Sequence, residues 1–368
     1  MQVVVVTGTR PQIIKTAPLL LALEKKNLVY SFIHTGQHYS YEMAAQVIER
    51  LDIREPDYNL EIGSGTNSYQ TYEIIRRLSD ILEQNRPDYL IVPGDTNSAL
   101  AAALVGFKMD IATCHLEAGL RSNDMRMQEE VNRRLIDHGS AALFAPTKTA
   151  AANLKSENVR GSIFQTGDTM YDLFKNRPSL FQDKFSSSEF LKSIEFESES
   201  FAILTLHRRE NVNNISRLKS IMDTLGTLDF EIIFPIHPRT KRIFEETSII
   251  QPQNVRVIAP VSYDVMMNLV GDSKLLVTDS GGLQKEAYLL NTPCVTIRDN
   301  TEWVETLHAG ANVLASPIGG DLLTKIEKMW GRELNNDATV YGNGNASEKI
   351  VNILSSGEVK IQSYNMIS

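Results

Sequence analysis

The sequence predicts an α/β protein made of two doubly wound, Rossmann-like domains. The chain has 368 residues, which at about 150 residues per domain is enough for two domains with separate cores. Short β-branched apolar runs alternate with longer amphipathic stretches, and this alternation is typical of βα units around a mostly parallel sheet. Hydrophobic residues make up 42% of the chain and charged residues 22%, a composition that excludes disordered and fibrous proteins.

The predicted strands form two sets separated by an irregular region. In the first half they span 3–7, 32–35, 89–92, 111–115, 142–145 and 163–166, and in the second half 203–206, 232–236, 255–258, 275–278 and 294–297. Helical patterns such as 11–25 and 68–85 lie between them, with apolar residues three and four positions apart in the second. Residues 174–200 contain Pro178 and a serine cluster and break the alternation, so we place the domain boundary near residue 166.

Charge and cysteine content exclude several classes of partner. The formal net charge is −8 and the pI about 5.5, so the whole chain repels nucleic acid and anionic membrane surfaces. We find neither a signal peptide nor an apolar stretch long enough to span a membrane. The two cysteines, Cys114 and Cys294, lie in separate apolar runs, which predicts no disulfide framework and fits a cytoplasmic location.

In parallel α/β sheets ligands bind beyond the carboxyl ends of the strands, so the residues that follow each strand are the candidate site. After the first strand, Arg10 and Lys15 lie near the start of a helix whose first turn contains Pro11. A helix N-terminus favours an anion, and two cations there strengthen the site. The alternative is a solvated basic first turn.

Carboxylates follow the next two strands of this half. Asp95 comes after the strand 89–92 and Glu117 after the strand 111–115, with Glu129 and Glu130 close behind. Clustered carboxylates are the usual equipment for moving protons. For Asp95 the alternative is capping the helix that starts near Ser98, and for one of the two glutamates it is a charge pair on a helix surface.

The strand ends of the second half combine histidines with a glycine-rich turn. His207 and His237 follow two strands. Ser280, Gly281 and Gly282 follow another strand and open a helix, where Ser280 caps the helix and the glycines let backbone N–H groups approach a phosphate. Glu286, one to two turns further on, lies within reach of a ribose diol. An ordinary glycine-containing βα turn is the alternative.

A metal site is not predicted. His34 and His38 could pair as ligands, but no third ligand with suitable spacing is evident.

The chain contains, in this order, the motifs GTRPQIIK, HTGQHY, PGDTNS, HLEAGLRS, QEEVNRRLIDH, TGDTMYD, LHRREN, PIHP and TDSGGLQKEA. In sequence and spacing they resemble the non-hydrolysing UDP-N-acetylglucosamine 2-epimerase family from residue 2 to about residue 314. The resemblance implies the glycosyltransferase-B architecture, in which two Rossmann-like domains face a cleft and the C-terminal helix returns to the first domain. The implied domains are 1–166 with about 346–368, and 167–345.

The resemblance also implies an isomerase. The family inverts C2 of the sugar, converting UDP-N-acetylglucosamine to UDP-N-acetylmannosamine for cell-surface polysaccharide precursors. UDP is eliminated across C1–C2 to give 2-acetamidoglucal, and it is added back after the proton returns on the other face. No NAD or metal is consumed, so we expect no cofactor. The expected partners are a small-molecule UDP-sugar and a second copy of the chain in a homodimer.

Roles for individual residues follow from matching the motifs. Ser280, Gly281 and Gly282 would hold the diphosphate and Glu286 the ribose. Arg10 and His207 would neutralise charge on the leaving UDP, and Lys15 would assist near the phosphates. The acidic residues matching those responsible for the C2 proton chemistry are Asp95, Glu117 and Glu129.

Three positions depart from the commonest family pattern. Gln12 stands in place of a glutamate, Lys285 replaces a glutamate, and Trp303 lies in a Thr-Glu-Trp-Val-Glu stretch that replaces a Thr-Glu-Arg-Pro-Glu-like one. These departures resemble the branch that acts on UDP-2,3-diacetamido-glucuronate, whose extra carboxylate would favour a neutral residue at position 12 if that position faces the sugar.

Other functions stay open from the sequence. A hydrolysing epimerase would release UDP and N-acetylmannosamine, and a glycosyltransferase would share the UDP site without needing the acidic cluster. Gln37, Arg208 and His237 leave room for an activating second substrate molecule.

Overall fold

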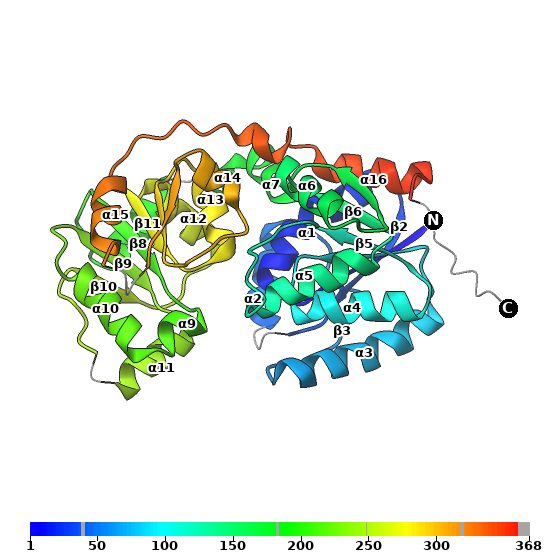
Figure 1. Ribbon diagram of the computed structural model, residues 1–368, viewed down its shortest axis with the longest axis horizontal. Coiled ribbons are helices and arrows are strands. Elements are labelled where there is room, and N and C mark those ends of the chain that lie inside the picture. The colour runs from blue at the N-terminus through cyan, green and yellow to red at the C-terminus, as the bar shows by residue number, and fades with distance from the viewer. Residues whose placement is uncertain (38–40, 182–183, 248, 317–319, 360–368) are drawn as a thin grey trace. The chain divides into compact units, whose positions relative to one another are not determined.

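The computed structural model describes residues 1–37, 41–181, 184–247, 249–316 and 320–359. They form two compact units (Figure 1). Unit 1 contains Met1–Asn176 and the chain from Thr339 onward, and unit 2 contains Arg177–Ala338. The division falls after residue 176 rather than near 166 because helix α7 (Thr169–Asn176) packs on helix α1 (Arg10–Lys25), with Thr169 Oγ1 donating to Lys15 O over 2.6 Å. Residues 360–368 of the predicted first domain, and His38, lie outside the described residues.

Unit 1 is built on a parallel sheet with the strand order β3-β2-β1-β4-β5-β6-β7. The order reverses at β1, which lies between β2 and β4, as in a doubly wound sheet. Its strands are β1 (Gln2–Thr7), β2 (Val29–His34), β3 (Tyr58–Asn59), β4 (Tyr89–Pro93), β5 (Ala112–Leu116), β6 (Ala142–Ala145) and β7 (Ser162–Gln165). The two-residue β3 was not predicted, because a pair of residues carries no periodic pattern.

Helices cover both faces of this sheet (Figure 1). The apolar residues of α3, α4 and α5 form one core with alternate residues of β1 and β4, while α1 packs on α2, α7 and α16. Besides α1 and α7, the described helices of unit 1 are α2 (Tyr41–Arg50), α3 (Asn67–Gln84), α4 (Asn97–Lys108), α5 (Gln128–Gly139), α6 (Lys148–Ser156) and α16 (Ala346–Ser356).

The C-terminal helix belongs to unit 1, as the resemblance implied. The Asp172 carboxylate of α7 accepts hydrogen bonds from the backbone N–H groups of Ala346 (2.9 Å) and Ser347 (2.7 Å) at the start of α16. A carboxylate at this position satisfies free N–H groups and complements the helix dipole. The backbone N–H of Asp168 also donates to Tyr341 O over 2.8 Å, so the returning chain joins unit 1 before residue 346.

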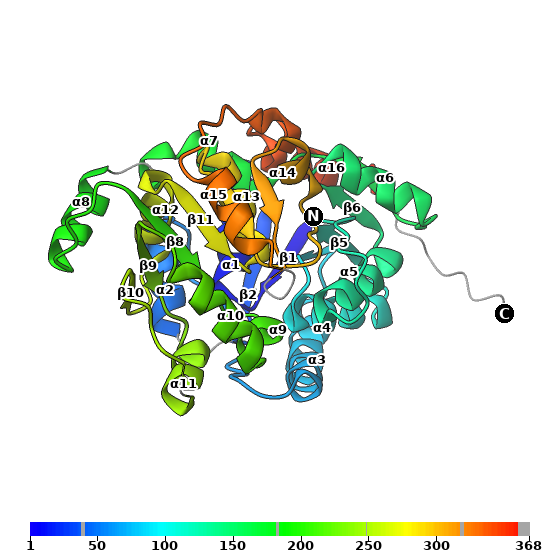
Figure 2. The same cartoon turned by 60° about the vertical axis from the view of Figure 1, so that its left-hand side comes forward.

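Unit 2 repeats the doubly wound plan with a parallel sheet in the order β10-β9-β8-β11-β12-β13. Helices α10 and α15 share one hydrophobic core with the sheet, while α12 packs on α8 and α13 (Figure 2). Its strands are β8 (Phe201–Thr205), β9 (Glu231–Pro235), β10 (Val255–Ile258), β11 (Leu275–Thr278), β12 (Cys294–Thr296) and β13 (Asn312–Leu314). Its helices are α8 (Lys184–Ser193), α9 (Arg209–Val212), α10 (Ile215–Leu225), α11 (Pro238–Glu246), α12 (Tyr263–Asp272), α13 (Gly281–Leu289), α14 (Val304–His308) and α15 (Leu322–Met329), with 3-10 turns at Pro178–Leu180 and Ala338–Tyr341.

The predicted α/β fold class and the predicted strands are confirmed. Three strands, 142–145, 255–258 and 275–278, have the predicted bounds, and the others differ by one to three residues at an end. The missed strand β13 is short and only partly apolar, because it lies at the edge of its sheet.

Gly119 offers a direct test of the tight packing in unit 1. Its φ is +83°, and a Cβ added there would lie 2.2 Å from the backbone oxygen of Ala150. We expect Gly119→Ala to destabilise the protein by about 3 kcal/mol, from backbone strain and a clash that backbone atoms cannot relieve. Thermal unfolding measures this effect. The control is Gly331→Ala, with φ +63° and no described heavy atom within 4 Å of the added Cβ, which should cost only about 1 kcal/mol; equal shifts would contradict the packing argument.

Candidate active site

The predicted site residues follow the strands at the reversal point of each sheet. In unit 1, Arg10 follows β1, Asp95 follows β4 and Glu117 follows β5, and these strands are neighbours in the sheet. In unit 2, His207 follows β8 and Ser280 follows β11, which are also neighbours. Adjacent parallel strands bring their carboxyl ends to one edge, so each unit gathers its candidates at its own switch point.

A buried ion pair lies at the centre of the unit 1 site. Lys15 Nζ donates to Glu117 Oε2 over 2.6 Å, and the two side chains are 18% and 3% exposed. Burial opposes the charge on Lys15, but Glu117, Asp95 and Asp168 favour it, and the net effect raises the pKa of Lys15 above its usual value. Lys15 is therefore a fixed cation among three carboxylates.

The backbone at Glu117 is held in an unfavourable conformation. Its φ is +66°, in the left-handed region that side chains other than glycine seldom adopt. Gly94 at the end of β4 also has a positive φ, and an added Cβ would lie 3.6 Å from Glu117 Oε2. Positive φ values at both positions place the Asp95 turn close to the Glu117 side chain.

Asp95 does not cap the helix that follows it. The N-cap of α4 is Thr96, whose side chain accepts a hydrogen bond from Ala99 N over 3.2 Å. The Asp95 carboxylate instead lies 2.7 Å from Arg133 Nη2 and is 28% exposed. The capping alternative is thus excluded, and Asp95 keeps a carboxylate that is both paired and accessible.

The neighbouring glutamates of α5 have different environments. Glu130 is fully buried, lies 3.0 Å from both Arg133 and Arg134, and accepts a hydrogen bond from Ser122 N over 2.8 Å. Glu129 lies half-exposed in the first turn of α5. The charge-paired structural glutamate is therefore Glu130, and Glu129 is left as the candidate for chemistry.

A second buried cluster supports the same strand ends. His115 Nδ1 lies 2.6 Å from Asp137 Oδ1, and Arg121 Nη1 lies 2.7 Å from Asp137 Oδ2. Burial opposes the charge of Asp137, but His115 and Arg121 lower its pKa below the usual range. Arg121 also makes two hydrogen bonds to Glu157, at 2.8 and 2.7 Å.

Gln12 has a structural reason to be neutral that does not involve the sugar. Its Oε1 accepts a hydrogen bond from Gly8 N over 2.8 Å, and its Nε2 donates to Pro93 O over 2.7 Å. The side chain is 3% exposed. Both polar atoms of the amide therefore have backbone partners, and a glutamate would lose the donor to Pro93 O. Arg10, in contrast, is half-exposed in the first turn of α1.

Asp279 organises the unit 2 site and was missed in the sequence. It is fully buried and accepts hydrogen bonds from the backbone N–H groups of His207 (3.1 Å) and Arg208 (2.9 Å) and from Asn211 Nδ2 (3.2 Å). Its carboxylate also lies 3.3 Å from His207 Nδ1, and this contact orients the His207 ring. The His207 side chain is 41% exposed. The signal that could have found Asp279 is the one used for Asp95, a carboxylate directly after a buried strand.

The glycine-rich turn forms the predicted helix start. Ser280 is the N-cap of α13, and its side chain accepts a hydrogen bond from Leu283 N over 3.4 Å. No described heavy atom lies within 4 Å of a Cβ added to Gly282, whereas one added to Gly281 would lie 2.2 Å from Glu302 Oε1. A side chain at position 281 would therefore displace the Glu302 carboxylate, and Gly282 leaves the helix start open to a ligand.

Glu286 is held by a tyrosine that the sequence did not indicate. Tyr263 Oη of α12 donates to Glu286 Oε1 over 2.7 Å, and Glu286 is 7% exposed. One carboxylate oxygen is therefore used internally.

Two of the sequence departures lie against each other. Lys285 is fully buried, and its Nζ lies 4.2 Å from the centre of the Trp303 ring. A cation over an indole face is a favourable pair when both are desolvated. Lys285 and Trp303 therefore act together in packing α13 against the loop before α14.

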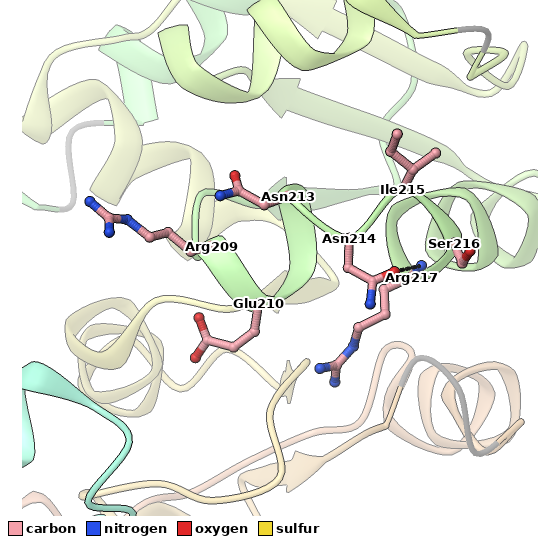
Figure 3. A pocket seen from close by; sticks show the side chains of 7 residues that line it. All are labelled: Arg209, Glu210, Asn213, Asn214, Ile215, Ser216 and Arg217. Carbon is pink, nitrogen blue, oxygen red and sulfur yellow. Dashed lines mark hydrogen bonds between the residues drawn. The ribbon is translucent and has the colours of Figure 1, made fainter.

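An open hollow of about 610 Å³ lies at the junction of α9 and α10 (Figure 3). It is lined by Arg209, Glu210, Asn213, Asn214, Ile215, Ser216 and Arg217. The side chain of Asn214 caps α10 by accepting from Arg217 N over 3.1 Å, so part of the hollow is the start of that helix.

Metal and thiol chemistry find no support in the described residues. No group of three or more His, Cys, Asp and Glu side chains among them is placed to hold a metal ion. Cys114 and Cys294 are buried free thiols, and burial raises the pKa of both, to about 12 for Cys294. In the part of the chain that the structure describes, none of the helices combines the length and apolar character of a membrane span.

Comparison with known proteins identifies the family. The family model described as UDP-N-acetylglucosamine 2-epimerase matches residues 21–355. The chain belongs to this family. A UDP-N-acetylglucosamine 2-epimerase of Methanocaldococcus jannaschii is 41% identical over 97% of this chain and 100% of its own length. A crystal structure from that organism, in complex with UDP-GlcNAc and UDP, matches with a TM-score of 0.91 over 97% of this chain and 100% of the other.

A relative with a different substrate is nearly as similar. The UDP-2,3-diacetamido-2,3-dideoxy-D-glucuronate 2-epimerase of Pseudomonas aeruginosa is 38% identical over 96% of this chain and 99% of its own length. The chain is therefore similar, over at least 96% of its length, both to a relative named for UDP-N-acetylglucosamine and to one named for UDP-2,3-diacetamido-2,3-dideoxy-D-glucuronate.

The charge network behind the site predicts an acid-sensitive stability. Hydrogen bonding to Arg121 is the main cause that lowers the pKa of Glu157 from 4.5, so its contribution is present above that value and is lost as pH falls through the folded-state pKa. We expect Glu157→Gln to cost about 2 kcal/mol at pH 7, because Arg121 loses a buried partner.

Urea unfolding at a series of pH values measures this effect. The difference in free energy of unfolding between wild type and Glu157→Gln should become smaller below about pH 4. The exposed Glu83→Gln is the control and should show no such trend; a difference independent of pH would contradict the assignment.

Proposed function

We propose that this protein is an isomerase that inverts C2 of a UDP-linked 2-acetamido sugar, with UDP-N-acetylglucosamine and UDP-N-acetylmannosamine as its substrate pair. The observation that carries the proposal is the cluster of Lys15, Glu117 and Asp95 at the switch point of unit 1. Family membership supports the same reaction. The product would serve cell-surface polysaccharide synthesis.

The unit 1 residues fit the proton transfers at C2. In the elimination a base takes the C2 proton, the C–H electron pair forms the C1=C2 double bond, and UDP leaves with the C1–O pair. Return of a proton to the opposite face, followed by re-addition of UDP to C1, gives the epimer. Two acid–base groups on opposite faces are the simplest arrangement, and Asp95, Glu117 and Glu129 are the proposed candidates. Lys15 donates a hydrogen bond to the Glu117 carboxylate and fixes its position.

The unit 2 residues fit a diphosphate leaving group. Cleavage of the C1–O bond builds negative charge on UDP, so donors and cations aimed at that charge accelerate the reaction. The open start of α13 at Ser280, Gly281 and Gly282 supplies backbone N–H groups. His207, oriented by Asp279, supplies positive charge or a proton, and Glu286 would bind the ribose. In unit 1, Arg10 is the further cation proposed to offset the charge of UDP.

A 2,3-diacetamido-glucuronate sugar is the second candidate substrate, and the Pseudomonas aeruginosa relative supports it.

We further propose a cytoplasmic homodimer. The buried free thiols Cys114 and Cys294 are consistent with a reducing compartment.

The test is to offer UDP-N-acetylglucosamine and UDP-2,3-diacetamido-glucuronate separately in deuterated water and to follow the products by NMR. We expect the manno epimer with deuterium at C2. Free UDP equimolar with the sugar product would show a hydrolysing enzyme, and sugar transfer without deuterium a glycosyltransferase. Failure to epimerise or label either sugar would overturn the proposal.

Replacing the accessible carboxylate should remove most of the activity. Asp95→Asn keeps the size of the side chain but cannot accept a proton, so we expect kcat to fall about 100- to 1,000-fold. Asp80→Asn on the exposed face of α3 is the matched control. Full turnover by Asp95→Asn would exclude Asp95 from the proton chemistry and favour the glycosyltransferase alternative.

Tyr263 should matter for binding rather than for chemistry. Tyr263→Phe removes the hydrogen bond that orients Glu286, so we expect KM for the UDP-sugar to rise about 3- to 10-fold with little change in kcat. Tyr288→Phe loses a similar bond to Asp337 O (3.0 Å) and serves as the control. Equal effects of both variants on KM would argue that packing, not Glu286, is responsible.

A further inference from the structure

The turn that carries Asp95 is held at three consecutive backbone carbonyls. Pro93 O accepts a hydrogen bond from Gln12 Nε2 over 2.7 Å. Gly94 O accepts one from His115 Nε2 over 2.8 Å, and Asp95 O accepts one from Asn132 Nδ2 over 2.8 Å. The three donors come from α1, β5 and α5 and are at most 5% exposed. Each bond fixes the orientation of one peptide plane, so side chains from three separate elements define the path of this turn.

The hydrogen bond from His115 to Gly94 O requires a proton on Nε2 of the ring. A backbone carbonyl can only accept, so the His115 Nε2 that faces Gly94 O carries a proton. Its Nδ1 faces the Asp137 carboxylate at 2.6 Å, and that carboxylate is also held by Arg121 and by Gly119 N at 3.1 Å. Asp137 therefore orients the ring so that Nε2 points at the turn.

The same turn is tied to the other catalytic candidates. Gly94 N donates to Leu116 O over 2.9 Å, directly before Glu117, and the Asp95 carboxylate itself pairs with Arg133 at 2.7 Å. Backbone and side chain of Asp95 are thus both restrained.

We propose that Gln12, His115 and Asn132 are positioning residues that set the direction of the Asp95 carboxylate toward the C2 proton. This inference rests on the proposed function. None of the three donors needs to touch the substrate, because each acts on the backbone that carries Asp95. Proton transfer depends steeply on geometry, and a misplacement of about 1 Å can cost 100-fold in rate. Loss of one donor should therefore lower kcat and leave KM nearly unchanged.

Asn132→Ala is the most direct test, with Asn254→Ala as its control. Asn254 Nδ2 also donates to backbone carbonyls, those of Leu225 (2.9 Å), Leu228 (3.1 Å) and Phe230 (3.2 Å), but it lies before β10, at the opposite edge of the unit 2 sheet. We expect Asn132→Ala to lower kcat about 10-fold with KM within about 2-fold. Asn254→Ala should lower the thermal midpoint and leave kcat within about 2-fold of wild type.

Two further variants separate the hydrogen bond from general loss of structure. His115→Phe should lower kcat more than His115→Gln, because the glutamine amide keeps a donor for Gly94 O.

The outcomes distinguish this inference from the proposed function. Loss of kcat in Asp95→Asn together with wild-type kcat in Asn132→Ala and His115→Phe would overturn the positioning role and leave the proposed function intact. Equal loss of kcat in Asn132→Ala and Asn254→Ala, or a change in KM alone, would also overturn it. Full activity of Asp95→Asn would remove the assignment on which the inference depends.

Discussion

A charge removed from water needs a partner, and unit 1 is arranged around that constraint. A series of ion pairs connects Asp95 to His115 through Arg133, Glu130, Arg134, Glu157, Arg121 and Asp137. His115 closes the series by donating to Gly94 O, next to Asp95. Acids and bases alternate along it, so every buried charge has an opposite neighbour. The turn that presents Asp95 is both the start and the end of this network.

At the end of β8, unit 2 meets the same constraint with one buried carboxylate, that of Asp279. The buried Asp279 takes up the backbone N–H groups that follow β8 and also faces the His207 ring. A free N–H group and a buried carboxylate are each costly alone, and together they satisfy each other. Both units therefore hold candidate site residues at a switch point by means of a fully buried carboxylate.

The backbone strain at Glu117 and the rigidity of its side chain occur at the same place in unit 1. Glu117 adopts a positive φ, which costs free energy and persists only where the surroundings enforce it. Lys15, packed within α1, donates to the Glu117 carboxylate and restrains the side chain that this backbone carries. The resulting site keeps its carboxylates in place before any ligand arrives, which is the condition under which charged groups stabilise a transition state most effectively.

Sequence reasoning was strongest where a local pattern has a single physical cause. Alternating apolar runs predicted the strands, and the rule that ligands lie beyond the carboxyl ends of strands selected Asp95, Glu117, His207 and Ser280. It was weakest for residues that act through partners distant in the chain. Tyr263 and Asn132 look like ordinary polar residues in the sequence, and the backbone partners of the Gln12 amide are not encoded in its neighbours.

By itself the sequence determined the two doubly wound sheets, the family and the strand ends that hold the candidate site residues, because these depend on periodicity and on motifs of adjacent residues. Only the tertiary structure decided that Glu130 is the buried structural glutamate, that Thr96 rather than Asp95 caps α4, and that Lys15 pairs with Glu117. Those outcomes depend on which side chains from separate elements share a desolvated space, and the spacing of residues along a chain does not encode that.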